Sequence, residues 1–274
     1  MANNIFENNQ LAIEIWNKKY RVNNETYTQW LERVTHNDGK IQQLIQQKKF
    51  IFGGRILANR GIGNSSLSNC YTHGQIADNL PAIMDACKDI ALTFKSQGGQ
   101  GLSLTAIRPE GTPVGNQFTS DGIVPFMEMF NKVTESISQG AGRRGALLMS
   151  IDIKHKEADK FIRIKSDLNK INNANISVEI DDEFMQCVQN YYMNGVINTM
   201  HMIRRYGNHV IEYDITPIKI FQLLAEHACK FAEPGVFFMD RFQHYHLNQF
   251  DPNYKIECSN PCKQISLQGF VVIR

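Results

Sequence analysis

Helix-like and strand-like segments alternate along most of this 274-residue chain, and this alternation constrains its fold more than any other feature. Apolar residues at three- and four-residue spacing predict helices over residues 79–96, 121–138, 156–166, 181–192 and 217–232. Short apolar runs between them predict strands over residues 101–107, 145–153, 174–180 and 235–240. Strands that are joined through helices pair in parallel, so the order predicts an α/β fold with a parallel sheet.

The N-terminal region has a different pattern. Residues 9–49 contain "LAIEIWNKKY", "TYTQWLERV" and "KIQQLIQQKK", all with helical spacing of apolar residues. Residues 52–70 are rich in Gly, Asn and Ser, and this composition predicts loops around a short apolar segment. We therefore expect a domain boundary near residue 52, with a helical region over 1–52 and an α/β domain over 53–274.

The composition excludes several classes of protein. A net charge of +2 gives no reason to expect nucleic acid or an anionic membrane as a partner. No apolar run reaches the length of a membrane span, and the N-terminus has no secretory signal pattern. Six cysteines spread over the chain do not form a secreted disulfide framework, so we expect a cytoplasmic protein.

Three glycine-rich loops are candidate ligand-binding segments. They are "SQGGQG" (96–101), "GTPVGNQFTSDG" (111–122) and "SQGAGRRG" (138–145). Glycine lets backbone N–H groups approach a phosphate, and the paired Arg143 and Arg144 suit an anionic ligand. Each loop alone is more often a tight turn, so a nucleotide site and simple turns both stay open.

The cysteines fall into two groups. Cys87, Cys187 and Cys229 lie in helical patterns between apolar neighbours, where a free cysteine packs as a small hydrophobe. Cys70 and Cys262 lie in polar turns, and cysteines in polar surroundings are more often reactive than cysteines in an apolar core.

The sequence gives little support to two other uses of the cysteines. Cys258 and Cys262 could be metal ligands, but no second ligand pair at zinc spacing accompanies them. A cysteine nucleophile needs a base, and none of His73, His155 and His201 stands in a recognisable setting.

Several motifs in one order resemble the catalytic subunit of ribonucleotide reductase. They are "NC" (69–70), "SQGGQGLSLTAIRPEGTPV" (96–114), "SQGAGRRGALLMSIDIKHKEADKFI" (138–162), "IKSDLNKINNANISVEIDDEF" (164–184) and "SNPC" (259–262). The resemblance extends over nearly everything from residue 50 to the end. "NPC" and "GRRGALLMS" are more similar to the adenosylcobalamin-dependent class than to the class with a separate diiron subunit.

The resemblance implies a ten-stranded α/β barrel made of two half-barrels, with a finger loop inside it. This chain would supply the first half-barrel and the start of the finger. Cys262 matches the cysteine that becomes a thiyl radical, Asn260 matches an asparagine that hydrogen-bonds the sugar, and Cys70 matches one of two cysteines that reduce the 2′ position and end as a disulfide. Asn69, Gly99 and Pro261 match positions that contact the ribonucleotide substrate.

The resemblance also implies a site for an allosteric effector, which would be a deoxynucleoside triphosphate or ATP. Asp78, Asn79 and Leu80 match the segment that holds the effector sugar, and Arg108 matches a phosphate contact. Residues 114–122 match a first specificity loop. Gln139, Arg143 and Arg144 fall in a second loop that links the effector to the substrate base. The helices near 79–96 and 121–137 match a homodimer region.

Two departures from the family pattern affect the expected activity. Lys263 and Gln264 stand where the family has Gly-Glu, and Gln264 cannot take a proton as that glutamate does. The sequence ends at Arg274, before the family's second redox cysteine and second half-barrel. We expect this chain alone not to reduce ribonucleotides.

Three readings follow from these departures. The chain is one part of a split enzyme with a complementary C-terminal polypeptide and a thioredoxin-type reductant, a non-catalytic deoxynucleotide-binding module, or a degenerate remnant.

Overall fold

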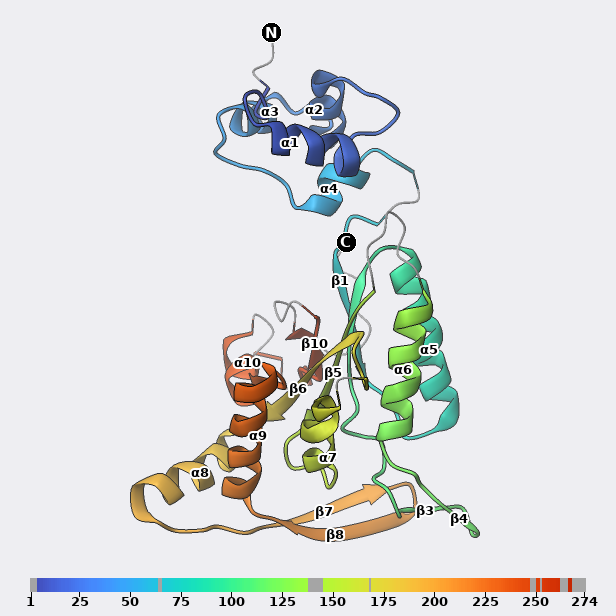
Figure 1. The fold of residues 1–274 in the computed structure, drawn as a ribbon, viewed down its shortest axis with the longest axis vertical. Coiled ribbons are helices and arrows are strands. Elements are labelled where there is room, and N and C mark those ends of the chain that lie inside the picture. Colours follow the sequence, from blue (N-terminus) through green and yellow to red (C-terminus); the bar gives the residue numbers. More distant parts are fainter. Residues whose placement is uncertain are drawn as a thin grey trace. The chain divides into compact units, whose positions relative to one another are not determined.

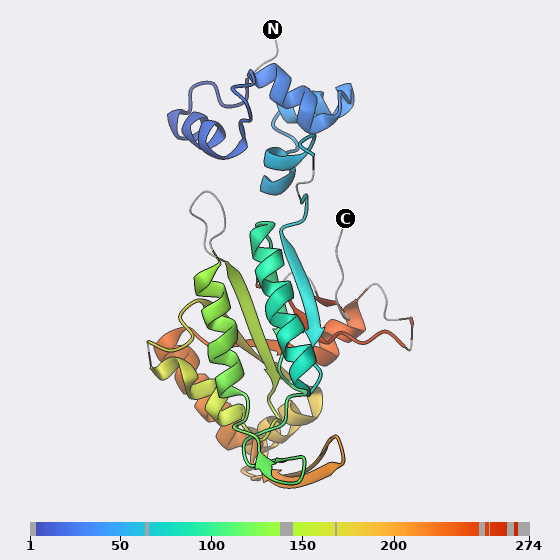
Figure 2. The ribbon, with the colours of Figure 1, turned by 90° about the vertical axis from the view of Figure 1, so that its right-hand side faces the viewer.

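The computed structural model describes residues 4–63, 66–137, 145–167, 169–246, 250–251, 253–261 and 266–267. The chain divides into two compact units between Asn69 and Cys70. Within the described ranges, no helix combines the length and the apolar character that a membrane span requires. Figures 1 and 2 show the ribbon from two directions.

The first unit is a small helical cluster, as its amphipathic patterns predict. It contains α1 (Gln10–Ile15), a π-helical turn (Trp16–Tyr20), α2 (Tyr27–Thr35), α3 (Gly39–Gln46) and α4 (Gly54–Asn59). A capping box between Thr26 and Gln29 starts α2. The fully buried Trp30 of α2 forms the centre of the cluster and donates from Nε1 to the Leu57 carbonyl at 3.2 Å.

The segment 52–70 differs in part from the expected loops. Residues 54–59 form α4, because Leu57 is buried against the helical cluster and this packing outweighs the glycine- and asparagine-rich composition. The expected boundary near residue 52 falls within this first unit, where Phe52 packs against the same cluster.

The second unit is built around a five-stranded parallel sheet, in the order β1-β2-β5-β6-β9. These strands are β1 (Cys70–Gln75), β2 (Gly99–Ser103), β5 (Ala146–Asp152), β6 (Ala174–Ile180) and β9 (Gly235–Phe238). The connecting helices are α5 (Leu80–Lys95), α6 (Val124–Ser136), α7 (Ala158–Arg163) with a 3₁₀ turn (Ile164–Ser166), α8 (Asp182–Asn194) and α9 (Pro217–Phe231). The predicted α/β fold with a parallel sheet is confirmed. The sheet is open in the described residues, with β1 and β9 at its edges.

Short elements complete the unit. They are β3 (Pro113–Val114), β4 (Phe118–Thr119), β7 (Met200–Tyr206), β8 (His209–Ile215), α10 (Met239–Tyr245), β10 (Cys258–Ser259) and β11 (Ser266–Leu267). The antiparallel hairpin β7–β8 was not predicted. A two-residue Gly207-Asn208 turn joins its strands, and Gly207 has a positive φ of 59°.

One face of the sheet is apolar and carries the helices. In α5, Asn79 caps the N-terminus by accepting from the Ala82 N–H at 2.9 Å, and Ile83, Ile90 and Phe94 are buried on one side of the helix. Figures 1 and 2 both show α5 and α6 side by side against the sheet. The core of the unit lies between this sheet face and the helices.

Candidate functional site

The face of the sheet opposite the core is polar. Side chains alternate between the two faces of a strand, and Leu147, Met149 and Ile151 of β5 belong to the core, so Ser150 and Asp152 point the other way. The register extends this face to the neighbouring strands. Its members in register are Cys70 with Gly99, Thr72 with Gly101, Ser103 with Ser150 and Ser177, and Asp152 with Glu179.

A distant segment of the chain crosses this polar face. Residues 256–261, here called the finger segment, include β10 and contact β1 and β2. A Cβ atom on Gly101 would lie 1.7 Å from the Ser259 carbonyl oxygen, and one on Gly99 would lie 3.4 Å from Cγ of Pro261. The thiol of Cys258 donates to the Gly101 carbonyl at 3.7 Å.

This arrangement gives a physical reason for the glycines of "SQGGQG". Gly101 makes room for the backbone of the finger segment, and Gly99 lies under the side chain of Pro261. Both glycines belong to β2, so this part of the stretch is a strand and not a turn or a phosphate-binding loop. The strand predicted over 101–107 is observed as β2 over Gly99–Ser103, so it begins and ends earlier than expected. Glycine is a poor strand former, but the close approach of a second backbone requires it here.

The predicted catalytic residues lie partly on this face. Cys70 starts β1 and is buried, and Asn260 of the finger segment is fully buried. Pro261, the residue before Cys262, packs over Gly99. Cys262 and Gln264 lie outside the described residues, as does Lys263. Asn69 is exposed and ends the first unit.

The other cysteines have structural surroundings, with one exception. Burial raises the pKa of the Cys258 thiol to about 12, and the negative charges of Glu179 and Glu257 add to the rise. Cys87 is buried in α5, where burial also raises its pKa, and Cys187 is half-buried. The expectation that Cys229 is buried was wrong: it is exposed on α9, near the helix C-terminus.

The alternatives of a metal site and of a cysteine–histidine pair gain no support. No group of three or more potential ligands gathers in the part of the chain that the structure describes. The three histidines have other partners: His73 lies 3.4 Å from Asp89, His155 contacts the Ile107 carbonyl at 3.0 Å, and His201 contacts Asp214 at 2.8 Å.

The predicted effector residues that are described come together where α5 begins. Arg108 donates from Nε to Oδ2 of Asp78 at 2.8 Å, from its backbone N–H to Oδ1 at 3.1 Å, and from Nη1 to the Pro113 carbonyl at 2.8 Å. Asn79 caps α5, and the adjacent Leu80 is 63% exposed. A fixed guanidinium, a helix N-terminus and an exposed apolar side chain thus lie together.

The remaining predicted effector residues are Gln139, Arg143 and Arg144, and all three lie outside the described residues. In sequence they follow the C-terminal end of α6. This helix has 13 residues and is about 20 Å long, and residues 108–122 precede its N-terminal end. The chain therefore enters the second predicted loop at the opposite end of α6 from Arg108.

Sequence reasoning missed a buried carboxyl group on the polar face. Glu179 of β6 is 8% exposed, and its Oε2 accepts from the Thr105 hydroxyl at 3.3 Å. Burial raises its pKa to about 7, and the charge of Asp152 adds to the rise while the hydroxyls of Ser150, Ser103 and Thr105 oppose it. The strict alternation in "ANISVEI" could have revealed it, because Glu179 shares a face with Ser177.

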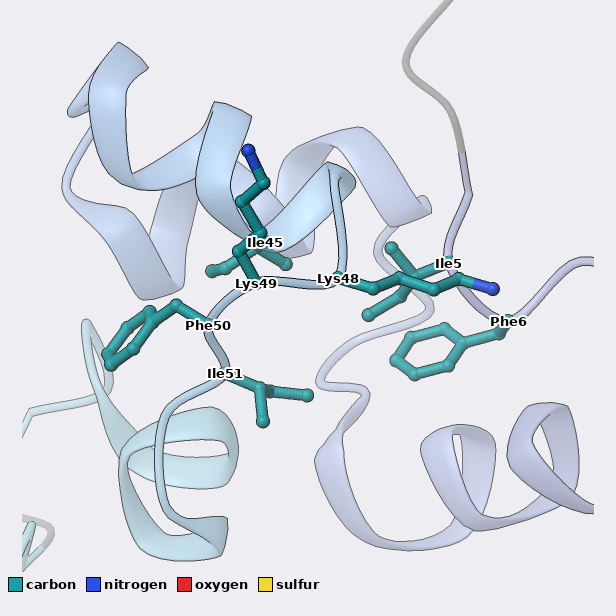
Figure 3. Close-up of a pocket in the computed structure, with 7 residues that line it drawn as sticks. All are labelled: Ile5, Phe6, Ile45, Lys48, Lys49, Phe50 and Ile51. Atoms are coloured by element: carbon teal, nitrogen blue, oxygen red, sulfur yellow. The ribbon is translucent and has the colours of Figure 1, made fainter.

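Two described pockets lie away from the polar face. One, in the first unit, has a volume of about 360 Å³ and is lined by Ile5, Phe6, Ile45, Lys48, Lys49, Phe50 and Ile51 (Figure 3). The other, of about 680 Å³, is lined by Lys165, Lys170, Asn172, Cys229, Lys230, Phe231, Ala232 and Glu233. None of the predicted site residues lines either pocket.

The described residues also form no cradle for adenosylcobalamin. This cofactor is a large ring system, whereas the backbone of Ser259 already lies directly on Gly101. The two described pockets contain no residue of the polar face.

Comparison with known proteins adds to this geometry. Residues 68–268 match the family described as "Ribonucleotide reductase, barrel domain". A protein named vitamin B12-dependent ribonucleoside-diphosphate reductase from Thermoplasma acidophilum is 30% identical over 234 residues, which cover 83% of this chain and 28% of that protein. A protein of the same name from Mycobacterium tuberculosis is 25% identical over 240 residues, which cover 87% of this chain and 32% of that protein.

A solved structure agrees on the fold. The class Id ribonucleotide reductase alpha subunit of Actinobacillus ureae superposes with a TM-score of 0.75 at 19% identity, covering 95% of this chain and 46% of that one. The present chain spans about a third or less of the length of the two curated relatives above.

Proposed function

The chain belongs to the ribonucleotide reductase barrel-domain family, and on that basis we propose that it forms the first half of a barrel in which ribonucleotides are reduced to deoxyribonucleotides. One observation carries this proposal. A parallel sheet presents a buried polar face with Cys70 on it, and the finger segment crosses that face immediately before Cys262. Burial of this kind keeps water away from a reactive sulfur.

The proposed chemistry assigns different tasks to the two cysteines. Cys262 carries the thiyl radical, and Cys70 is one of two reducing thiols. Replacement of the 2′ hydroxyl by hydrogen consumes two electrons, and oxidation of two thiols to a disulfide supplies two. Asn260 hydrogen-bonds the sugar. Gln264 has an amide that can hydrogen-bond but cannot accept a proton as a carboxylate does.

Substrate contacts are proposed for Asn69, Gly99 and Pro261. Gly99 is suited to this role because it has no side chain and lies on the polar face in register with Cys70. Pro261 packs over Gly99, so one ligand can contact both residues.

An effector site is proposed where α5 begins. The exposed Leu80 offers an apolar contact, Asn79 orders the helix N-terminus, and Arg108 is fixed by Asp78. A helix N-terminus favours anionic groups, and a guanidinium binds phosphate oxygens. These features support binding of a deoxynucleoside triphosphate.

A homodimer is proposed as the form that completes this effector site. Leu80, Met84 and Leu92 of α5 are 63%, 51% and 55% exposed, an apolar row of the kind that packs between helices. The predicted effector residues belong to opposite ends of α6 in the sequence. An antiparallel arrangement of two α5–α6 pairs would bring Arg108 of one copy near the second loop of the other.

The cofactor and the reductant are proposed for the whole enzyme. The relatives from Thermoplasma acidophilum and Mycobacterium tuberculosis are named vitamin B12-dependent, which supports a cobalamin as radical source. A thioredoxin-type protein would reduce the disulfide after each turnover.

Hydrogen exchange of the purified chain with two nucleotides tests these assignments. ADP should slow backbone exchange in β1, β2 and the finger segment, and dTTP should slow it around residues 78–82 and 108–114. If neither nucleotide changes exchange in its region at millimolar concentration, the proposed function is wrong. Protection by dTTP alone would favour the non-catalytic binding module.

A further inference from the structure

The buried carboxyl of Glu179 has no task in the proposed reduction. It lies on the polar face of β6, beside the row of hydroxyls formed by Ser103, Ser150 and Ser177. Its Oε2 accepts from Thr105, but neither its Oε1 nor the Ser177 hydroxyl has a hydrogen-bond partner among the described residues. Two buried polar atoms on one strand face therefore lack a partner in the part of the chain that the structure describes.

The charged groups around Glu179 do not neutralise it. Asp152, its neighbour in register on β5, is paired with Arg204 of the hairpin. The finger segment contributes two titratable groups near Glu179, which are Cys258 and Glu257. The negative charges of Glu179 and Glu257 both raise the pKa of the Cys258 thiol. Within the described chain no lysine, arginine or histidine forms an ion pair with Glu179, and the Asp152 charge raises its pKa further.

Such a carboxyl is costly to bury for packing alone. The other face of the same strand buries Ile176, Val178 and Ile180, so an apolar side chain would be the stable choice at a merely structural position. A buried acceptor without a protein partner calls for a donor from outside the protein, and a bound ligand is one such donor.

The ligand must donate hydrogen bonds and carry no negative charge at this point. A phosphate would be repelled, because Asp152 and Glu179 already lie together. A metal ion needs several ligands, and no such group gathers in the described residues. A neutral hydroxyl satisfies both the Glu179 carboxylate and the Ser177 hydroxyl.

We propose that Glu179 contacts a sugar hydroxyl of the bound ribonucleotide through Oε1, with Ser177 as a second contact. This inference rests on the proposed function, because the substrate is a nucleotide that lies on the face shared with Cys70 and Gly99. Glu179 is thus a substrate-contacting residue, and its carboxylate is the acceptor.

Binding of a hydroxyl then becomes linked to a proton. A hydrogen bond donated to a carboxylate favours its ionised form and lowers its pKa. Because the pKa of Glu179 is about 7 without ligand, the group is roughly half protonated at pH 7 and releases roughly half a proton on binding.

Isothermal titration calorimetry of the full chain with ADP at pH 7 measures both effects. Saturating dTTP occupies the proposed effector site in every run, and two buffers with different heats of ionisation give the number of protons released. The wild type should release roughly half a proton per ADP. E179Q should release about half a proton less than the wild type and should bind about tenfold more weakly or worse, because an ionised acceptor is lost.

Matched controls separate this role from a general effect on folding. E212Q changes an exposed glutamate of the hairpin in the same way, and its affinity and proton release should equal those of the wild type. S177A, which tests the second contact, should weaken binding by about threefold or more. With the wild-type chain, either 2′-deoxy-ADP or 3′-deoxy-ADP should bind more weakly than ADP and release fewer protons.

The outcomes distinguish this inference from the function on which it rests. If ADP binds to E179Q as tightly as to the wild type, with the same proton release, the inference is wrong and the proposed function stands. If the wild type binds none of ADP, GDP, CDP and UDP, the proposed function fails and this inference falls with it. Equal affinity of the wild type for ADP and both deoxy analogues would also overturn the contact.

Discussion

Substitution of Gly101 by alanine tests whether the finger segment lies on the sheet. A Cβ atom at this position would be 1.7 Å from the Ser259 carbonyl oxygen and 2.7 Å from its carbonyl carbon. Ordinary contact requires about 3.5 Å, so the finger backbone would have to move by about 1.8 Å. Because Ser259 and Asn260 are themselves buried, this movement breaks packing on both sides of the contact.

The expected cost follows from that displacement. Insertion of an atom into a packed site costs about 1–3 kcal/mol, and the backbone clash puts G101A at the upper end, near 3 kcal/mol. With a urea slope of about 3 kcal/mol per molar, the unfolding midpoint should fall by about 1 M. Gly99→Ala is the graded control. Its nearest contacts would be 3.2–3.4 Å, so it should cost about 1 kcal/mol or less.

Labelling of the Cys258 thiol detects the same movement of the finger segment. Cys258 is 2% exposed and its pKa is raised to about 12, so iodoacetamide should not modify it in the native wild type. G101A should expose it, and peptide mapping by mass spectrometry separates it from the exposed Cys229. A wild-type urea midpoint together with an unmodified Cys258 in G101A would refute the close approach.

Three further perturbations test other parts of the account. Asn79→Ala removes the cap of α5 and should lower the free energy of unfolding, measured in urea, by about 1 kcal/mol. Asn79→Asp keeps an acceptor at the cap and should retain most of the wild-type stability. Equal losses in the two variants would argue against capping. Arg108→Ala should weaken dTTP binding, measured by calorimetry, by about tenfold or more. Lys132→Ala removes an exposed cation of α6 and should leave dTTP binding unchanged. Identical effects of the two substitutions would rule out a specific phosphate contact. Between about pH 4.5 and pH 7 the free energy of unfolding should fall as pH rises, by about 3 kcal/mol at most, because the folded state holds the Glu179 proton up to a pKa of about 7 and the unfolded state releases it near 4.5. This slope should be smaller in E179Q, and parallel curves for the two proteins would contradict a raised pKa.

Much of the fold was predictable because local signals agreed with tertiary packing. The strand expected over 174–180 is β6, and the helix expected over 79–96 is α5 with Asn79 as its cap. Elements that depend on distant partners were not predictable from local signals. β2 begins at Gly99 because the finger segment, more than 150 residues later, lies on its glycines. α4 forms because Leu57 is buried in a glycine-rich stretch.

The site was predictable in a similar, partial way. The resemblance named Cys70 and Asn260 by position, and the sheet register explains why Cys70 and Gly99 share a face. Asp78 and Arg108 are 30 residues apart, and their contact could not be derived from spacing. Glu179 was missed because an acidic residue in a strand usually faces solvent. Here Glu179 lies on an inner strand, between Asp152 of β5 and Phe237 of β9, and is buried.

The function proposed for this polar face is to form half of a ribonucleotide-reducing barrel. The most direct test supplies the remaining barrel strands of the Thermoplasma acidophilum relative as a second polypeptide, with adenosylcobalamin and a dithiol reductant, and measures dADP formed from ADP. The account predicts dADP that depends on the presence of this chain and is abolished by Cys70→Ser and by Cys262→Ser. Formation of a stable complex that makes no dADP, or dADP formation that both serine variants leave unchanged, would contradict it.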